Sequence, residues 1–191
     1  QSEDTLRKSS EILLGVAIPA SIGLIILAVP IIELLFQRGE FSSSDVLSSA
    51  RTLQAYSFGI VFFGINRLIV SSYHAVFEVK YPMKCAYYTL FSNIIFSLLL
   101  VYPFGYIGIA FATSISSFVN YFLLTRRNFA LKSGVPIPDF MLIIRKFLFP
   151  ACSMASVLCF LNFFIWEYMQ TDMNKVLFLF FEIVFSAFLY F

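Results

Sequence analysis

Two long apolar segments joined by a tight turn place the strongest constraint on how this chain can fold. They are Pro82–Tyr102 and Tyr106–Arg127, and Pro103-Phe104-Gly105 separates them. At a helical rise of about 1.5 Å per residue, about 21 residues span roughly 31 Å, which is the thickness of the hydrocarbon core of a bilayer. We therefore predict a hairpin of two transmembrane helices, and the rest of the chain can be placed relative to it.

Each helix of this hairpin carries a few polar residues. Asn93 and Ser97 lie four positions apart on the first helix, and Thr113 and Asn120 lie seven apart on the second. These spacings put each pair on one helix face. An unpaired amide in hydrocarbon costs several kcal/mol, so we expect these faces to point into protein or into a wet cavity.

The composition agrees with a membrane protein. The chain is 60% hydrophobic and 13% charged, whereas a soluble domain is about 25% charged. The single histidine and the three cysteines form no metal-binding pattern, and no nucleophile, phosphate-loop or zinc-protease motif occurs. We expect an integral membrane protein that is neither an enzyme nor a binder of nucleic acid.

The remaining apolar segments predict four further membrane spans. The first is Glu11–Phe36, which Pro19 and Pro30 should bend or break. The second is one long helix, Asp45–Val76, which a capping box formed by Ser42 and Asp45 should open. The last two are Met141–Trp166 and Val176–Phe191. The fold class is therefore an all-α, polytopic transmembrane bundle with about six spans.

Two features of the ends lead us to expect part of a longer protein. The chain has no initiator Met, and its sixth apolar segment is too short to cross a bilayer before the chain stops at Phe191. We interpret the sixth span as truncated.

The distribution of Lys and Arg predicts the orientation. When successive ends of the spans are assigned to alternate sides, nine basic residues fall on the side of the N-terminal segment and three on the other. The nine are Arg7, Lys8, Lys80, Lys84, Arg126, Arg127, Lys132, Arg145 and Lys146; the three are Arg38, Arg51 and Lys175. Cytoplasmic loops are enriched in basic residues, so the first side should be the cytoplasm.

The sequence PIIELLFQRGEFSSSD starts at Pro30, and YHAVFEVKYPMK starts at Tyr73. These two stretches resemble, respectively, the outer loop and the cytoplasmic loop of the MurJ (MviN) family of lipid II flippases. GYIGIAFATSISSFVNYFLL, starting at Gly105, is similar to the following span. The cytoplasmic loop departs from the family pattern, because Tyr73 replaces Phe, His74 replaces Tyr and Glu78 stands where Asp is usual.

The resemblance implies the fold of the multidrug/oligosaccharidyl-lipid/polysaccharide exporter superfamily, with two six-helix bundles around a cavity. Residues 1–128 would be the last four helices of the second bundle, and residues 129–191 two additional helices. The implied activity is the movement of lipid-linked peptidoglycan precursor across the bacterial inner membrane by alternating access. Membrane lipids and cell-wall synthesis enzymes would be partners. The alternatives are a different flippase or drug exporter of the superfamily, and a non-transporting scaffold.

The resemblance also implies a sodium site on the hairpin. Asn93 and Thr113 match the family's oxygen ligands, and the backbone carbonyl of Ile109 would add another. Ser97 stands where the family has a carboxylate, so this site would have less negative charge. The alternative is that Asn93 and Thr113 hold neighbouring helices together through hydrogen bonds.

Two further polar sites lie within spans. Asn66 and Arg67 lie in the inner half of the second span, where an arginine would suit the pyrophosphate of a lipid-linked substrate. Alternatively, Arg67 extends towards the cytoplasmic headgroups. Glu182 lies on an apolar background in the sixth span, and we expect either a functional carboxylate or a polar contact with another helix.

Overall fold

The computed structural model describes residues 2–131, 140–165 and 172–190, and these residues form helices and short turns without any strand. The helices are α1 (Ser2–Ile26), α2 (Ala28–Phe36), α3 (Ser43–Ser57), α4 (Ile60–Ala75), α5 (Lys80–Phe104), α6 (Tyr106–Leu131), α7 (Phe140–Ile165) and α8 (Asp172–Tyr190). The predicted all-α class is confirmed.

Four stretches of the described residues are long and apolar enough to cross a bilayer: Lys8–Ile26, Ser43–Ala75, Lys80–Phe104 and Tyr106–Arg126. They correspond to the first four predicted spans, and α7 and α8 coincide in position with the fifth and sixth. Helix α6 continues to Leu131, so the predicted boundary at residue 128 lies inside that helix. The prolines of the predicted linker lie outside the described residues.

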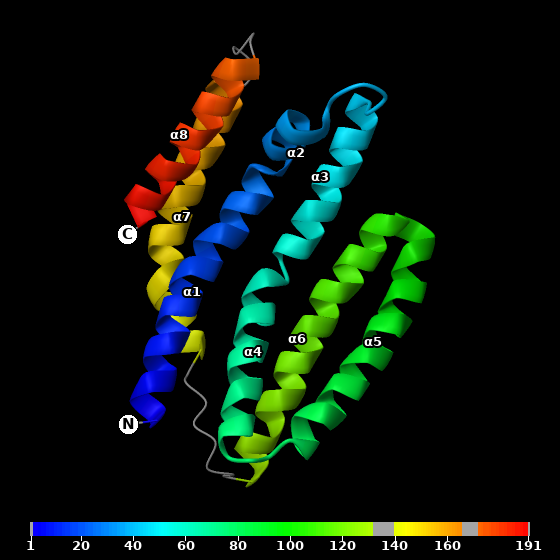
Figure 1. The fold of residues 1–191 in the computed structure, drawn as a ribbon, viewed down its shortest axis with the longest axis vertical. Helices are drawn as coiled ribbons and strands as arrows, with labels where there is room; N and C mark the ends of the chain where they lie inside the picture. The colour runs from blue at the N-terminus through cyan, green and yellow to red at the C-terminus, as the bar shows by residue number, and fades with distance from the viewer. Residues whose placement is uncertain (1, 132–139, 166–171, 191) are drawn as a thin grey trace.

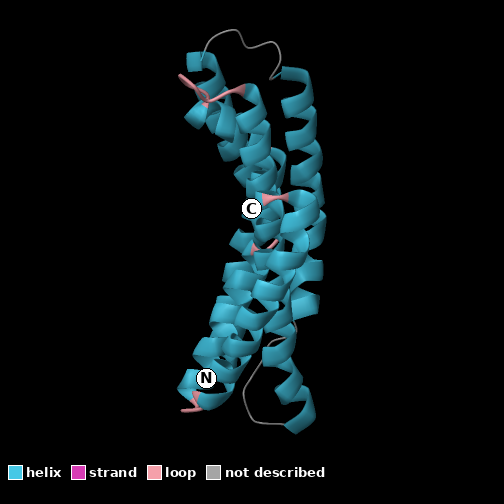
Figure 2. Cartoon of the chain, turned by 90° about the vertical axis from the view of Figure 1, so that its right-hand side faces the viewer, coloured by secondary structure: helices cyan, strands magenta, loops and turns pink. Residues whose placement is uncertain are grey.

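The helices pack side by side in one elongated bundle (Figures 1 and 2). Helix α1 contacts α7 on one side and α4 on the other, α6 packs against both α3 and α4, and α5 packs mainly on α6 (Figure 1). The paired α7 and α8 therefore lie on the opposite side of the bundle from the α5–α6 hairpin. The N-terminus and the α4–α5 turn lie at one end, and the α2–α3 turn lies at the other. The ends of successive spans therefore lie at alternate ends of the bundle, as the count of basic residues on the two sides assumed.

The first span bends at Leu27, three residues before Pro30. Proline has no backbone N–H, so the carbonyl four residues earlier, on Ile26, loses its helical donor. Helical hydrogen bonds persist on both sides of the bend, because the Leu27 N–H donates to Gly23 and the Ile31 N–H donates to Leu27. The predicted interruption is therefore confirmed at Pro30, whereas Pro19 lies inside α1 without ending it.

The second span is also interrupted, and the prediction of one continuous helix from Asp45 to Val76 is wrong. Helix α3 ends at Ser57 and α4 begins at Ile60. The Gly59 N–H donates to the carbonyl of Tyr56 at 2.9 Å, one residue short of its α-helical partner. The carbonyl of Ala55 therefore loses its usual donor in the middle of an apolar segment.

Polar side chains from neighbouring helices donate to backbone carbonyls at or beside these two interruptions. Ser114 Oγ of α6 donates to the Ala55 carbonyl at 2.6 Å, and Ser21 Oγ of α1 donates to the Ser57 carbonyl at 2.7 Å. Gln54 Nε2 of α3 donates to a carbonyl of α1 beside its bend, that of Ile25, at 2.8 Å. Broken helices survive in membranes where neighbours provide such donors. These three bonds join α1, α3 and α6.

The start of α3 has the predicted capping box. The Ser42 backbone N–H donates to Asp45 Oδ2 at 2.9 Å, and the Asp45 N–H donates to Ser42 Oγ at 3.4 Å. Each side chain thus satisfies a backbone donor that the first turn of a helix leaves free. This cap begins the second span directly after the polar turn.

Two glycines allow the tight hairpin between α5 and α6. Gly105 has a positive φ of 58°, which glycine adopts without steric cost. A Cβ on Gly108 would lie 2.1 Å from the backbone oxygen of Leu100, so only glycine lets the two backbones approach this closely. The predicted transmembrane hairpin is confirmed, with Gly105 as its turn.

We predict that Ser114→Ala lowers the free energy of unfolding of the full-length protein by about 1–2 kcal/mol, because the Ala55 carbonyl loses its donor inside the bundle. Thermal unfolding in detergent measures this effect. Ser116→Ala is the matched control, since Ser116 is also buried but donates within α6, to Ala112. Equal losses for the two variants would contradict the role assigned to Ser114.

Candidate functional site

The residues of the predicted sodium site form two hydrogen-bonded pairs, one on each helix of the hairpin. On α5, Ser97 Oγ donates to Asn93 Oδ1 at 3.0 Å. On α6, Thr113 Oγ1 donates to the backbone carbonyl of Ile109, also at 3.0 Å. Helices α5 and α6 pack along one another, so the two pairs belong to one helix–helix unit. The three polar side chains are half-buried.

This arrangement bears on the two roles that the sequence left open. The helix-linking alternative predicts hydrogen bonds between helices, yet those of Asn93 and Thr113 remain within α5 and α6 respectively. The Ser97 hydroxyl donates its hydrogen bond to the Asn93 side-chain oxygen, and the Thr113 hydroxyl donates to the Ile109 carbonyl. Both hydroxyl oxygens keep lone pairs that can accept a further contact. The four residues therefore present an amide oxygen, two hydroxyl oxygens and one backbone carbonyl, which fit a hard cation in kind. None of the four is a carboxylate.

Asn66 and Arg67 occupy different environments despite being adjacent in sequence. Asn66 is 7% exposed, and its Nδ2 donates to the Ser117 carbonyl of α6 at 2.8 Å. Its Oδ1 is buried without a hydrogen-bond partner. Arg67 is exposed. Asn66 therefore joins α4 to α6, and only Arg67 is available on the surface of this chain.

Arg67 belongs to an exposed polar face of α4. Phe63, Arg67, Ser71 and His74 are all exposed, and their spacing of three or four residues places them on one side of the helix. The opposite side carries Ile65, Ile69 and Tyr73, which are buried in the bundle. A membrane helix face with an arginine, a serine and a histidine is unsuited to lipid, and such faces line cavities or contact protein.

Two tyrosines hold the α4–α5 turn against α6. Tyr73 Oη donates to the Leu124 carbonyl at 2.9 Å, and Tyr81 Oη donates to the Leu123 carbonyl at 2.6 Å. The two rings lie 5.5 Å apart. Sequence reasoning overlooked these anchors, although both tyrosines belong to the cytoplasmic-loop motif that starts at Tyr73. Amphipathic aromatic residues on either side of a short loop are the signal that would have indicated them.

The fold and these sites define a class. The protein is a multi-pass α-helical membrane protein with two interrupted spans, and polar groups lie at the interruptions and along one helix face. Interrupted helices with exposed oxygen and nitrogen groups at membrane depth are typical of transporters, where they bind ions and substrates.

The comparison with protein families identifies the chain more closely. The family model described as "Lipid II flippase MurJ" matches residues 1–182. The chain belongs to this family, and the predicted resemblance is confirmed.

Two relatives and one solved structure illustrate the similarity. The chain is 35% identical over 168 residues to a probable lipid II flippase MurJ of Buchnera aphidicola, covering 87% of this chain and 33% of the relative. It is 38% identical over 122 residues to the lipid II flippase MurJ of Thermosipho africanus, covering 63% and 26%. A structure titled "Lipid II flippase MurJ, inward closed conformation" matches with a TM-score of 0.74 and 29% identity, covering 96% of this chain and 37% of that chain. The chain thus spans about a third of the length of these proteins.

We predict that a cysteine at position 67 of the full-length, otherwise cysteine-free protein reacts with a membrane-impermeant thiol reagent, and that Asn66→Cys does not. The reason is that position 67 is exposed and position 66 is buried against α6. Labelling in intact vesicles, read by mass spectrometry, measures this.

In the same experiment, Phe63→Cys shows whether Arg67 lines a cavity, as substrate binding requires, or extends towards the cytoplasmic headgroups. Position 63 lies on the same exposed face as position 67, one helical turn further from the end of α4 at Ala75. Labelling there indicates an aqueous cavity along α4. If position 63 is protected while position 67 reacts, Arg67 reaches towards the headgroups instead.

Proposed function

We propose that this chain is part of a flippase that moves lipid-linked peptidoglycan precursor from the inner to the outer leaflet of the bacterial inner membrane by alternating access. The observation that carries the proposal is the exposed face of α4, which presents Arg67 within the candidate membrane span Ser43–Ala75 of a chain that belongs to the lipid II flippase family. By the predicted domain organisation, residues 1–128 complete the second transport bundle.

Arg67 is the residue proposed to contact the substrate. A lipid-linked sugar carries a pyrophosphate, and a guanidinium binds phosphate oxygens through two parallel hydrogen bonds. Asn66 supports this role indirectly, because its bond to Ser117 attaches α4 to α6 beside Arg67 and thereby orients the exposed face. Asn66 is thus a positioning residue in this proposal.

Sodium binding between α5 and α6 would supply a driving force. We propose that Asn93, Ser97, the Ile109 carbonyl and Thr113 contribute oxygen ligands to one ion. The support is that the four oxygens lie on two helices that pack together, and that their mutual hydrogen bonds leave lone pairs available. The absence of a carboxylate among them favours weak, readily reversible binding.

The proposal concerns transport without covalent chemistry, so it assigns no enzymatic role. Membrane lipids surround the bundle, and the enzymes that polymerise the precursor are proposed to receive it. A flippase for another polysaccharide-linked lipid, or a scaffold that kept the fold alone, are the competing functions.

Complementation tests the proposed function. The full-length gene should restore growth and outer-leaflet precursor in bacteria depleted of their own lipid II flippase. Arg67→Gln should abolish rescue at unchanged protein level, because the charge that binds phosphate is lost. Arg38→Gln in the outer turn is the control and should still rescue. Rescue by Arg67→Gln would remove Arg67 from the substrate site, and failure of the wild-type protein would refute the proposed substrate.

Sodium binding is tested separately from transport. We expect NaCl to raise the melting temperature of the purified full-length protein more than KCl at equal ionic strength, because bound ligand stabilises the folded state. Asn93→Ala should remove this sodium-specific increase. Thr89→Ala is the control, since Thr89 makes a comparable bond within α5, to the Cys85 carbonyl. A sodium effect that survives Asn93→Ala would contradict the proposed site.

A further inference from the structure

A buried carboxyl group in α8 has no role in the transport mechanism described above. Glu182 is 0% exposed, and both of its carboxyl oxygens are buried without a hydrogen-bond partner. It lies near the middle of α8, on the same side as the buried Leu179 and Tyr190. Most carboxylates in protein interiors are paired or hydrogen-bonded, so a completely buried and unpartnered one calls for a physical explanation.

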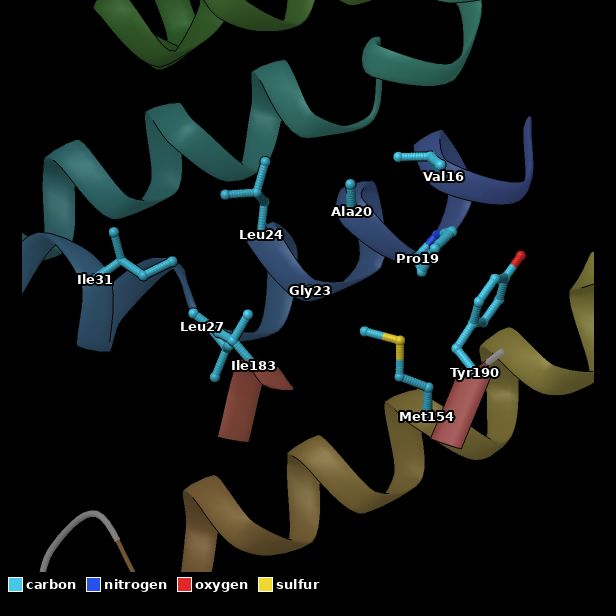
Figure 3. A pocket seen from close by; sticks show the side chains of 10 residues that line it. All are labelled: Val16, Pro19, Ala20, Gly23, Leu24, Leu27, Ile31, Met154, Ile183 and Tyr190. Atoms are coloured by element: carbon cyan, nitrogen blue, oxygen red, sulfur yellow. The ribbon is translucent and has the colours of Figure 1, made fainter. Parts of the chain in front are cut away.

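Helix α8 packs against its neighbours with an apolar cavity close to Glu182 in sequence. Helix α8 packs mainly on α7 and contacts α2 and α1 more sparsely. A cavity of about 430 Å³ lies between these helices, with Leu27 of α1–α2, Met154 of α7 and Ile183 of α8 among the lining residues (Figure 3). Ile183 is the direct neighbour of Glu182. The contact of α8 with α1 and α2 is therefore incompletely packed at the residue that follows Glu182 in the chain.

No charged partner for Glu182 is described on any helix that packs against α8. Helix α2 has Glu33, which is half-buried, and α1 has Lys8 and Glu11. Glu11 forms an ion pair with Lys146 of α7 at 3.7 Å. The other described titratable residues of α7 are the exposed Arg145, Cys152 and Cys159, and α8 itself has Tyr190, eight positions from Glu182. None of these groups forms a hydrogen bond to either carboxyl oxygen.

An ionised carboxylate in such a place would lose its hydration without gaining a counter-charge, and proteins avoid that state by binding a proton. We propose that Glu182 is a proton-binding site whose occupancy is linked to the docking of α8 on α1 and α2. In the docked arrangement the carboxyl group is neutral. When α8 separates and water enters the cavity, the acid releases its proton to solvent and becomes charged. The charged form then opposes re-docking until a proton is taken up.

This linkage makes the position of the C-terminal helix depend on proton activity. Proton uptake accompanies docking, so acidic conditions favour the docked form and alkaline conditions favour separation. The inference does not rest on the proposed substrate, because it concerns a different pair of helices from α4 and the α5–α6 unit.

The protonation state is tested directly on the full-length protein in lipid vesicles. Infrared spectroscopy should show the carbonyl stretch of a protonated carboxyl group at neutral pH, and Glu182→Gln should lack it. As a second measurement that needs no variant, dicyclohexylcarbodiimide, which modifies protonated carboxyls in apolar surroundings, should label Glu182 in peptide maps. A carboxylate stretch assigned to Glu182, together with absence of carbodiimide labelling, would overturn the proposal.

The linkage to docking is tested by cross-linking. In a cysteine-free background, Leu27→Cys and Ile183→Cys place two thiols on the walls of the same cavity. The disulfide yield with Glu182, divided by the yield with Glu182→Gln at the same pH, should fall several-fold from acidic to alkaline pH. The ratio cancels the pH dependence of the thiols themselves. A ratio that does not change with pH would refute the linkage, even if Glu182 proved to be protonated.

Discussion

A backbone carbonyl released inside a bilayer must find a donor, and this requirement organises the bundle. Both of the first two spans are interrupted, one by the missing N–H of Pro30 and one at Phe58 and Gly59. Water cannot satisfy the freed groups in hydrocarbon. Ser114 donates to the released Ala55 carbonyl, and Ser21 and Gln54 donate to carbonyls beside the two interruptions, so these bonds join α1, α3 and α6. Helix packing here therefore follows from backbone chemistry as much as from apolar contact.

The polar side chains fall into groups that differ in whether they form hydrogen bonds to a neighbouring helix, within their own helix, or to no partner. Ser114 and Asn66 face neighbouring helices and bond to their carbonyls, which makes them structural. Thr113 and Ser97 bond within their own helices and leave oxygen atoms available. Arg67 faces outward from α4, and Glu182 is enclosed without a partner. The available or unpartnered groups are the ones to which a ligand, an ion or a proton can be assigned.

The sites lie on different parts of the bundle, which bears on how they can communicate. Helix α6 contacts α3, α4 and α5, so the ion-site candidates and the face that carries Arg67 share one helix as a common support. Helices α7 and α8 contact α1, on the opposite side (Figure 1). Coupling between Glu182 and the face that carries Arg67 can pass through α1, which contacts both α7 and α4, or through α2, which contacts both α8 and α3.

The number and position of the apolar segments, the capping box at Ser42 and the hairpin turn at Gly105 were determined by the sequence alone, because hydropathy, cap chemistry and backbone freedom are local properties. The family loops were recognisable for the same reason. The interruption at Gly59 and the choice of Ser114 as its donor were decided by the tertiary structure. Thr113, Ser114, Ser116 and Ser117 look alike in sequence, and only the approach of α3 to α6 determines which hydroxyl meets a released carbonyl. The burial of Glu182 was decided in the same way, since a carboxyl group on an apolar helix can face a neighbouring helix or open space, and packing alone selects between them.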